Sequence, residues 1–324
     1  MDRKCYLIRE EHIPEKAAFP VVDAHNHLWG DKDVESLVNT MDAVGVVCFA
    51  NLTANARIAF EGGGYVVRQK SFESFLEACA NRYPGKFYGF TMVNFANPVS
   101  EPLFENAESF VEEAICLLRE HVALGARGLK GLTELGMHYR DASGKLISVD
   151  DPRLSEIWEE AGQLGVPVLI HQSNPVGLFD PASPENEHYE TLVKYPSWSY
   201  SDPVFPRKAE LLERRDNLVR GHPNTTFILP HVANFAENLG YVSDLLEENP
   251  NVYIDFSSRI DELGRQPYSA REFFIRFQDR ILFGTDTPVS VEVYRCYFRF
   301  LETFDEYFFP PSSSIMLCAK QVAL

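Results

Sequence analysis

The sequence has little positive charge to set against its acidic residues. It carries 30 lysine and arginine residues against 47 aspartate and glutamate residues, a formal net charge of -17 at pH 7. Nucleic acids and anionic membranes are bound mainly through cationic surface, so this balance argues against both as partners. We expect a small-molecule substrate as the partner, and the sequence leaves self-association into a homodimer open.

Long apolar runs and clustered cysteines are also missing. No apolar stretch is long enough to span a bilayer, and residues 1–16 contain no apolar segment of the kind that a signal peptide needs. The 6 cysteines are scattered without CxxC spacing, which is typical of reduced thiols and not of a zinc knuckle or a disulfide framework. These absences predict a cytoplasmic protein.

A dinucleotide-binding fingerprint and internal repeats are absent as well. No GxGxxG motif opens a helix after the first apolar run, and the three glycines at residues 62–64 fit a flexible loop. A doubly wound open sheet stays open as the structural alternative, although its usual sequence cue is missing.

Short apolar runs alternate with amphipathic patterns along the chain. Eight runs are typical of buried strands, at residues 19–25, 44–50, 87–93, 126–130, 166–170, 225–229, 252–256 and 280–284. Helical spacing predicts helices at residues 34–41, 72–83, 110–121, 154–161, 235–246 and 291–309. Buried strands separated by helices favour parallel pairing, so we predict a (β/α)8 TIM barrel.

The length suits one such barrel. A chain of 324 residues with 45% hydrophobic residues can bury a large core. We therefore predict a single domain over residues 1–324, with the barrel core at 19–290 and a C-terminal helix and tail at 291–324.

Ionisable residues stand where several of these strands end. His25 and His27 close the first run, and because side chains two apart on a strand share a face, their imidazoles can converge on one cation. His171 follows the fifth run, His231 the sixth and Asp286 the eighth. Since the active site of such a barrel lies at the carboxyl ends of its strands, we expect these residues to meet. His222 precedes its strand and belongs on the opposite face.

This residue set predicts a metal site. The imidazoles of His25, His27 and His171 with the carboxylate of Asp286 suit Zn²⁺ first, with Mn²⁺, Co²⁺ or Fe²⁺ as alternatives. Zinc lowers the pKa of bound water towards about 7. Asp286 could bind the metal and take the proton of that water, while His231 could orient the water or polarise a carbonyl. Asp23 could either support these ligands or make a strand-end hydrogen bond.

The same residues resemble the amidohydrolase superfamily. Asp23-x-His25-x-His27, the strand-end His171 and His231, and Phe283-Gly284-Thr285-Asp286 are similar to motifs of its amidohydrolase-related group, family 2. That group includes aminocarboxymuconate-semialdehyde decarboxylase and several lactonases, and the resemblance spans roughly residues 21–288. It implies a metal-bearing barrel with His25, His27, His171 and Asp286 at the family's ligand positions and His231 at that of its catalytic histidine.

The sequence departs from the resemblance at two places. Binuclear members of the superfamily carry a carboxylated lysine on strand four, near Lys130; family 2 usually holds one metal, so we expect one ion and a substrate-anion contact at Lys130. The family commonly has another closing helix after the one expected at 291–309. Here Pro310-Pro311-Ser312-Ser313-Ser314 and a short apolar tail follow, so we expect an incomplete or rearranged outer shell.

The substrate-binding residues are predicted from the loops. Residues 172–206 form an unusually long loop that could cover the site, with Asn174 and Trp198 contacting a flat or cyclic substrate; an edge-packing insert is the alternative. Arg259, beyond the seventh strand, could pair with a substrate carboxylate or form a surface salt bridge. His188 in the long loop could contact the substrate, although we expect it to be exposed and without a role.

These observations together predict an enzyme. We expect a metal-dependent hydrolase whose activated water attacks an amide, ester or lactone carbonyl of a small compound, with or without a carboxylate group. A non-oxidative decarboxylase of a cyclic or unsaturated acid needs the same ligands and stays open. The third hypothesis is a barrel that binds metal but has no catalytic activity.

Overall fold

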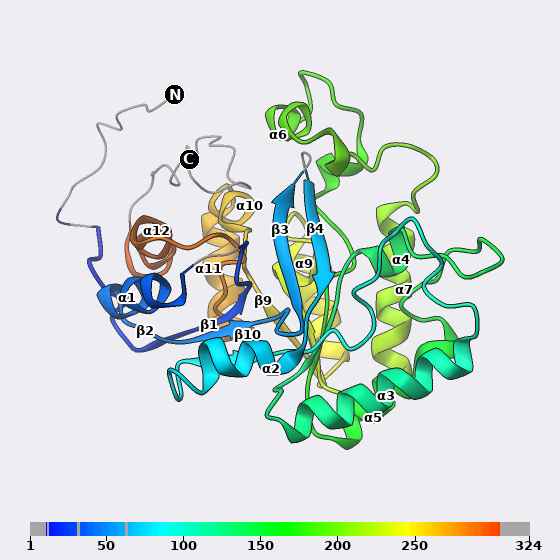
Figure 1. The fold of residues 1–324 in the computed structure, drawn as a ribbon. Helices are drawn as coiled ribbons and strands as arrows, with labels where there is room; N and C mark the ends of the chain where they lie inside the picture. Colours follow the sequence, from blue (N-terminus) through cyan, green and yellow to red (C-terminus); the bar gives the residue numbers. More distant parts are fainter. Residues whose placement is uncertain (1–10, 12, 31–32, 62–63, 305–324) are drawn as a thin grey trace.

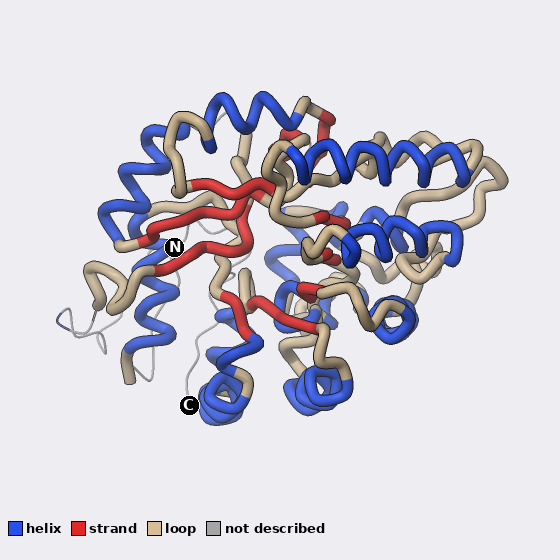
Figure 2. The backbone as a smooth tube through the Cα atoms, turned by 90° about the horizontal axis from the view of Figure 1, so that it is seen from below, coloured by secondary structure: helices blue, strands red, loops and turns tan. Residues whose placement is uncertain are grey.

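The computed structural model describes residues 11, 13–30, 33–61 and 64–304. Within this part, eight parallel strands form the predicted barrel (Figures 1 and 2). They are β1 (Val21–Asn26), β2 (Val46–Asn51), β5 (Phe87–Gly89), β6 (Leu129–Gly131), β7 (Val168–Ile170), β8 (Phe227–Leu229), β9 (Val252–Asp255) and β10 (Ile281–Leu282). Each overlaps one of the eight predicted runs, so the strand predictions are confirmed.

The barrel closes through two short connections between its sheets. One sheet has the order β1-β2-β5 and the other β10-β9-β8-β7-β6. On one side the Thr91 amide donates to the Gly128 carbonyl at 2.9 Å and the Lys130 amide donates to the Thr91 carbonyl at 2.8 Å. On the other side the Ala24 amide donates to the Phe283 carbonyl at 2.9 Å. The eight strands therefore run round a closed ring, and all carboxyl ends face one way.

Helices surround the strands on the outside of the ring (Figure 2). The longer ones are α1 (Val34–Val44), α3 (Ala107–Ala123), α5 (Ser155–Gln163), α7 (Lys208–Gly221), α9 (Leu239–Glu248), α11 (Pro267–Arg276) and α12 (Val291–Glu302). A short α2 (Phe72–Phe75) continues as the π-helix η2 (Leu76–Ala80). A helix overlaps each of the six predicted ranges, but the helix expected from residue 235 begins only at Leu239 and the last one ends at Glu302. Residues 305–309 and the tail lie outside the described residues.

Local sequence explains where these helices begin and end. The Asp33 side chain accepts from the amide of Ser36 at 2.9 Å, and α1 ends at Gly45 with φ 83°. The Asp151 carboxylate accepts from the Arg153 amide at 3.1 Å and caps the short helical turn that leads into α5. No helix of the described part is long and apolar enough to cross a membrane.

Side chains alternate between two hydrophobic layers. In β7, Val168 and Ile170 point outward into the large core that also holds Trp158 of α5. Leu169, between them, points into the barrel interior, where it packs with Ile228 of β8. The barrel is thus filled at its base by apolar side chains, and polar groups collect at the carboxyl ends of the strands.

The structure adds elements that the sequence patterns did not predict. An antiparallel hairpin of β3 (Ala56–Glu61) and β4 (Gly64–Gln69) follows β2. The helices α7, α10 (Ile260–Gly264) and α11 were also missed; α7 is rich in charged residues, so its apolar spacing is weak. The remaining short elements are α4 (Glu134–Met137), η3 (Pro152–Leu154), η4 (Val176–Phe179), α6 (Tyr189–Lys194), η5 (Pro196–Trp198), α8 (Pro230–Ala233) and η6 (Gln278–Arg280).

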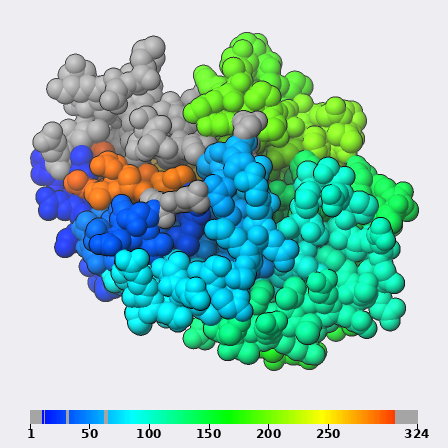
Figure 3. All heavy atoms as spheres, viewed as in Figure 1, coloured from blue at the N-terminus to red at the C-terminus, as the bar shows by residue number. Residues whose placement is uncertain are grey.

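The β3–β4 hairpin and the long loop lie at the carboxyl end of the barrel. The long loop predicted at 172–206 contains η4, α6 and η5, and it rises on the same side of the barrel as the hairpin (Figure 1). In Figure 3 the hairpin, in light blue, stands beside the green segment that carries α6. The hairpin and the loop are therefore placed to form walls around whatever binds at the strand ends.

Candidate metal centre

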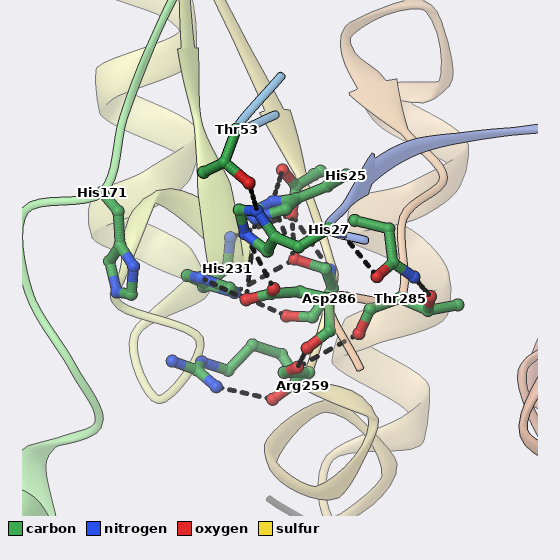
Figure 4. A network of polar contacts seen from close by, with 12 residues as sticks. His25, His27, Thr53, His171, His231, Arg259, Thr285 and Asp286 are labelled. Atoms are coloured by element: carbon green, nitrogen blue, oxygen red, sulfur yellow. Dashed lines mark hydrogen bonds and ion pairs between the residues drawn. The ribbon is translucent and has the colours of Figure 1, made fainter. Parts of the chain in front are cut away.

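The strand-end residues lie at the carboxyl end of the barrel, as their sequence positions indicated. His25 is in β1 and His27 follows it, His231 lies in the turn after β8, and Asp286 follows β10. Ligand atoms of His25, His231 and Asp286 all lie within 4.8 Å of one another. Figure 4 shows these side chains and His27 pointing toward a common centre.

The carboxylate of Asp286 is at the middle of the group. Its Oδ2 lies 3.6 Å from Nε2 of His25 and 3.5 Å from Nε2 of His231, and its Oδ1 lies 3.3 Å from Nε2 of His27. Among the described residues, Nε2 of His25 and Nε2 of His231 are buried without a hydrogen-bond partner. Buried polar nitrogens are rarely left unpaired, so these two fit a role as metal ligands or proton acceptors.

Side-chain and backbone groups hold the far nitrogen of each imidazole. Nδ1 of His25 lies 2.7 Å from the Asp255 carboxylate, and Nδ1 of His231 lies 2.8 Å from the Ser257 carbonyl. Both partners accept, so each Nδ1 carries the proton and each Nε2 presents its lone pair toward Asp286. Nδ1 of His27 contacts the Thr53 hydroxyl at 3.0 Å. Such contacts orient imidazoles for metal binding.

Sequence reasoning missed these supporting residues. Asp255 ends β9 and is buried, and an acidic residue inside the apolar run at 252–256 was the available signal. Thr53 and Ser257 follow their strands by two residues and carry no pattern of their own.

Burial sets the protonation of the group. Burial lowers the pKa of His27 to about 4 and those of His171 and His231 well below the ordinary histidine value. Burial alone would raise the pKa of Asp286, but His25, His27 and Lys130 outweigh it and hold that pKa well below its usual range. The result is an ionised Asp286 beside the imidazoles of His27 and His231, which burial keeps neutral, and neutral imidazoles with a carboxylate are the forms that bind a divalent metal.

Strained backbone places two of these side chains. His231 has φ 59° and Asp286 has φ 47°, in the left-handed region that non-glycine residues seldom adopt. The amide of His231 donates to Asp255 at 3.1 Å, and the amide of Asp286 donates to the His25 carbonyl at 2.9 Å. Strain of this kind persists only where surrounding contacts hold it, and it concentrates at functional sites.

Asp23 forms hydrogen bonds that hold the segment carrying Asp286. Its carboxylate accepts from the hydroxyl of Thr285 at 2.8 Å, the amide of Thr285 at 3.2 Å and the hydroxyl of Tyr294 at 2.9 Å. Burial raises the pKa of Asp23 to about 6, partly offset by these hydrogen bonds. Of the two roles expected for Asp23, the structure therefore shows the strand-end hydrogen bond, which ties β1 to the segment after β10 and to α12.

His171 stands apart from the convergent group (Figure 4). Its ring centroid is 4.4 Å from that of His231, but its Nε2 hydrogen-bonds to the Ser173 carbonyl at 3.0 Å. The metal-ligand role of His171 stays a prediction. His222 lies at the base of the barrel, where it contacts the Ser155 hydroxyl at 2.7 Å, so its placement on the opposite face was right.

A pocket opens above the centre. All four residues predicted to bind substrate line it together with His27, His171 and Asp286; they are Lys130, Asn174, Trp198 and Arg259. Trp29 and Phe60 stack with centroids 4.8 Å apart and form part of an aromatic wall. His188 also lines the pocket and is only partly exposed, so the expectation that it is exposed was wrong, while a role as a substrate contact stays a prediction.

Lys130 points into this pocket from β6. It is fully buried, and within the described residues its Nζ has no hydrogen-bond partner. Burial lowers its pKa to about 8, while Asp286, Asp255 and Glu134 act in the opposite direction. An amine in this setting is ready to pair with a ligand anion.

Comparison with known proteins gives a family and a fold. A family model described as amidohydrolase matches residues 22–305. A TIM-barrel protein from Bordetella bronchiseptica is 20% identical with a TM-score of 0.53, over 85% of this chain and 78% of that chain. A 2,6-dihydroxybenzoate decarboxylase from Rhizobium is 15% identical with a TM-score of 0.50, over 86% and 91%. Among curated proteins no match was found. At these identities the structural likeness concerns the fold.

Proposed function

The chain belongs to the amidohydrolase family, and on that basis we propose that it is a metal-dependent hydrolase. Its substrate is a small, carboxylated compound with an amide, ester or lactone carbonyl. The observation that carries this proposal is the convergence of His25, His231 and Asp286, in which two buried imidazole nitrogens without partners in the described structure face an ionised carboxylate.

One divalent ion, zinc in first place, suits this donor set. His25, His27, His171 and Asp286 are the residues that would hold it, since neutral imidazoles and a carboxylate are typical zinc ligands. When bound, such an ion polarises a carbonyl and makes water more acidic. Manganese, cobalt or iron would fit the same donors less specifically.

The chain's own residues handle the protons. The Nδ1 proton of His231 is committed to the Ser257 carbonyl, so its Nε2 can accept a proton from attacking water. In the protonated form this nitrogen donates a hydrogen bond to the oxyanion that develops on the substrate. As the oxyanion collapses, Nε2 of His231 can pass this proton to Asp286 Oδ2, 3.5 Å away, which returns it to the leaving group.

A non-oxidative decarboxylase is the second candidate. Two cationic side chains, Lys130 and Arg259, line the pocket and favour a substrate carboxylate near the centre. In this reaction protonated His231 would deliver the proton to the carbon that loses carbon dioxide. Hydrolysis and decarboxylation would use the same side chains, so the two reactions are distinguished by their products.

Metal analysis followed by product assays tests the proposal. Purified protein should contain one divalent ion per chain; His25→Ala and His27→Ala should lose it while His222→Ala, at the barrel base, keeps it. Lactones, esters and amides are then assayed for hydrolysis, and aromatic and unsaturated acids for carbon dioxide release. Hydrolysis supports the first proposal and carbon dioxide release the second. Protein without metal or turnover would indicate a non-catalytic barrel.

A further inference from the structure

A second set of polar groups lines the same pocket as Asp286. Oε2 of Glu262, Nη2 of Arg259 and Nε2 of His188 are buried, and the described residues provide no hydrogen-bond partner for any of them. Glu262 is 4% exposed and Arg259 2% exposed. Three unpaired polar atoms in one wall are costly to bury unless something that binds there pairs with them.

These groups come from two separate parts of the chain. Arg259 and Glu262 belong to the start of α10, whereas His188 lies in the loop at 172–206. Nε2 of His188 is 3.9 Å from Oε1 of Glu262, which is too long for a hydrogen bond. An ion pair between Arg265 and Glu187 ties the loop to α10 beside this gap.

Arg259 lies near Glu262 but does not form an ion pair with it in the described structure. Nη1 of Arg259 donates to the Ser258 carbonyl at 2.5 Å, and no ion pair joins Arg259 to Glu262 among the described contacts. The positive charge of Arg259 acts on both Glu262 and His231, so Arg259 lies within electrostatic range of both. Burial raises the pKa of Glu262, and Arg259 offsets part of that rise.

We propose that Glu262 and His188 form a specificity subsite for a hydrogen-bond-donating substituent, an amino or hydroxyl group, on the substrate. Glu262 Oε2 accepts from the substituent and His188 Nε2 makes the second contact, while Arg259 pairs with an anionic group nearer the metal centre. The aromatic wall that includes Trp29 and Phe60 suits a flat ring between these groups. This inference rests on the proposed function in one respect: the reacting end of the substrate lies at the centre formed by His25, His231 and Asp286.

Matched ligand pairs test the subsite directly. Binding of the three aminobenzoates and three hydroxybenzoates is measured by calorimetry on metal-loaded protein, beside the three methylbenzoates and benzoate. Because a site built around a hydrogen bond rejects analogues that lack it, at least one amino or hydroxy compound should bind tenfold or more tightly than its methyl counterpart. Equal affinity within every pair, or no binding by any of these ligands, would overturn the proposal.

Substitution then assigns the preference to the residue. Glu262→Met keeps the length of the side chain and removes the acceptor, so the preference should disappear while benzoate affinity changes less than twofold. Glu190→Met, at an exposed glutamate of α6 in the same loop, should keep the preference. If Glu262→Met does not fold, Glu262→Gln serves and should weaken the preference severalfold. An unchanged preference in the folded variant refutes the role of Glu262.

The outcome can be told apart from failure of the proposed function. Metal content and turnover report on the centre formed by His25, His231 and Asp286, whereas the ligand preference is read from binding alone. A preference lost in Glu262→Met supports the subsite even if the enzyme proves to be a decarboxylase. Normal turnover with an unaltered preference refutes the subsite and leaves the proposed function standing.

Discussion

The contact between Asp255 and His25 allows a quantitative prediction about metal affinity. Oδ1 of Asp255 accepts from three donors, the Ser257 hydroxyl at 2.6 Å, the Ser257 amide at 3.0 Å and the His231 amide at 3.1 Å. Oδ2 faces Nδ1 of His25 at 2.7 Å. In Asp255→Asn the three donors keep the amide oxygen in place of Oδ1, so the amide NH₂ must face His25.

This substitution reverses the tautomer of His25. The new NH₂ group donates, so Nδ1 must accept and the imidazole proton moves to Nε2, where it blocks the lone pair that faces Asp286. Loss of a contact that orients a metal-binding histidine typically costs 10- to 100-fold in metal affinity, or about 1.4 to 2.8 kcal/mol. We expect a loss in this range for zinc.

Competition with a chromophoric chelator measures the affinity. Asp244→Asn, the same substitution at an exposed position of α9, should leave the zinc affinity unchanged. Urea unfolding of the metal-free proteins shows whether Asp255→Asn still folds. A folded Asp255→Asn variant that binds zinc within twofold of the wild type would refute the assignment of His25 as a ligand oriented by Asp255.

Three further substitutions test other contacts of the site. In Gly284→Ala the new Cβ would lie 2.6 Å from Cβ of His25, so we expect about 1 to 3 kcal/mol lower stability in urea and weaker zinc binding. Burial raises the pKa of Asp23 to about 6, so the folded state favours the protonated carboxyl, and the stability this gives at low pH is lost as the pH rises from about 4 to about 6. In metal-free protein, Asp23→Asn should abolish this pH-dependent loss of stability. Lys208→Met leaves two backbone carbonyls, each 2.5 Å from Nζ, without their donor and should lower stability by about 2 kcal/mol.

Each of these has a control and a contradicting result. Gly221→Ala, where a Cβ meets no atom within 4 Å, should be neutral, and equal zinc affinity in Gly284→Ala would contradict the close packing on His25. For Asp23, the free energy of unfolding of the wild type and of Asp23→Asn is measured at several pH values. A difference between the two that does not change with pH would show that Asp23 does not titrate as argued. Lys194→Met, at an exposed lysine of α6, is the control for Lys208→Met. An equal loss of stability in the two variants would contradict a stabilising role for the contacts between Lys208 and the two backbone carbonyls.

Local patterns explain why so much of the barrel was predictable. A buried parallel strand is a short apolar run, and all eight runs appear as strands because each needs only its own residues and flanking turns to be seen. The hairpin at β3 and β4 and the helix α7 were missed for the opposite reason. In the sequence, the apolar spacing of α7 is weak because charged residues dominate it, and the three glycines at residues 62–64, at the junction of the two hairpin strands, fit a flexible loop.

The same distinction holds at the candidate site. Because parallel strands in a barrel end at one face, the positions of His25, His231 and Asp286 after their strands were enough to predict that they lie together. The metal-ligand roles of these residues, of His27 and of His171 stay predictions. Asp255 was not recognised, since nothing near it in the sequence indicates that it faces a histidine 230 positions away.

The sequence by itself determined the strand order, the face on which the ionisable residues gather and the types of donor atom available, because these follow from local periodicity and chain direction. Only the tertiary structure decided which nitrogen of each imidazole faces Asp286, since the partners of the other nitrogen, Asp255 and the Ser257 carbonyl, come from β9 and its following turn. It also decided that His188 and Glu262 share a pocket wall, because loop packing depends on contacts between distant segments.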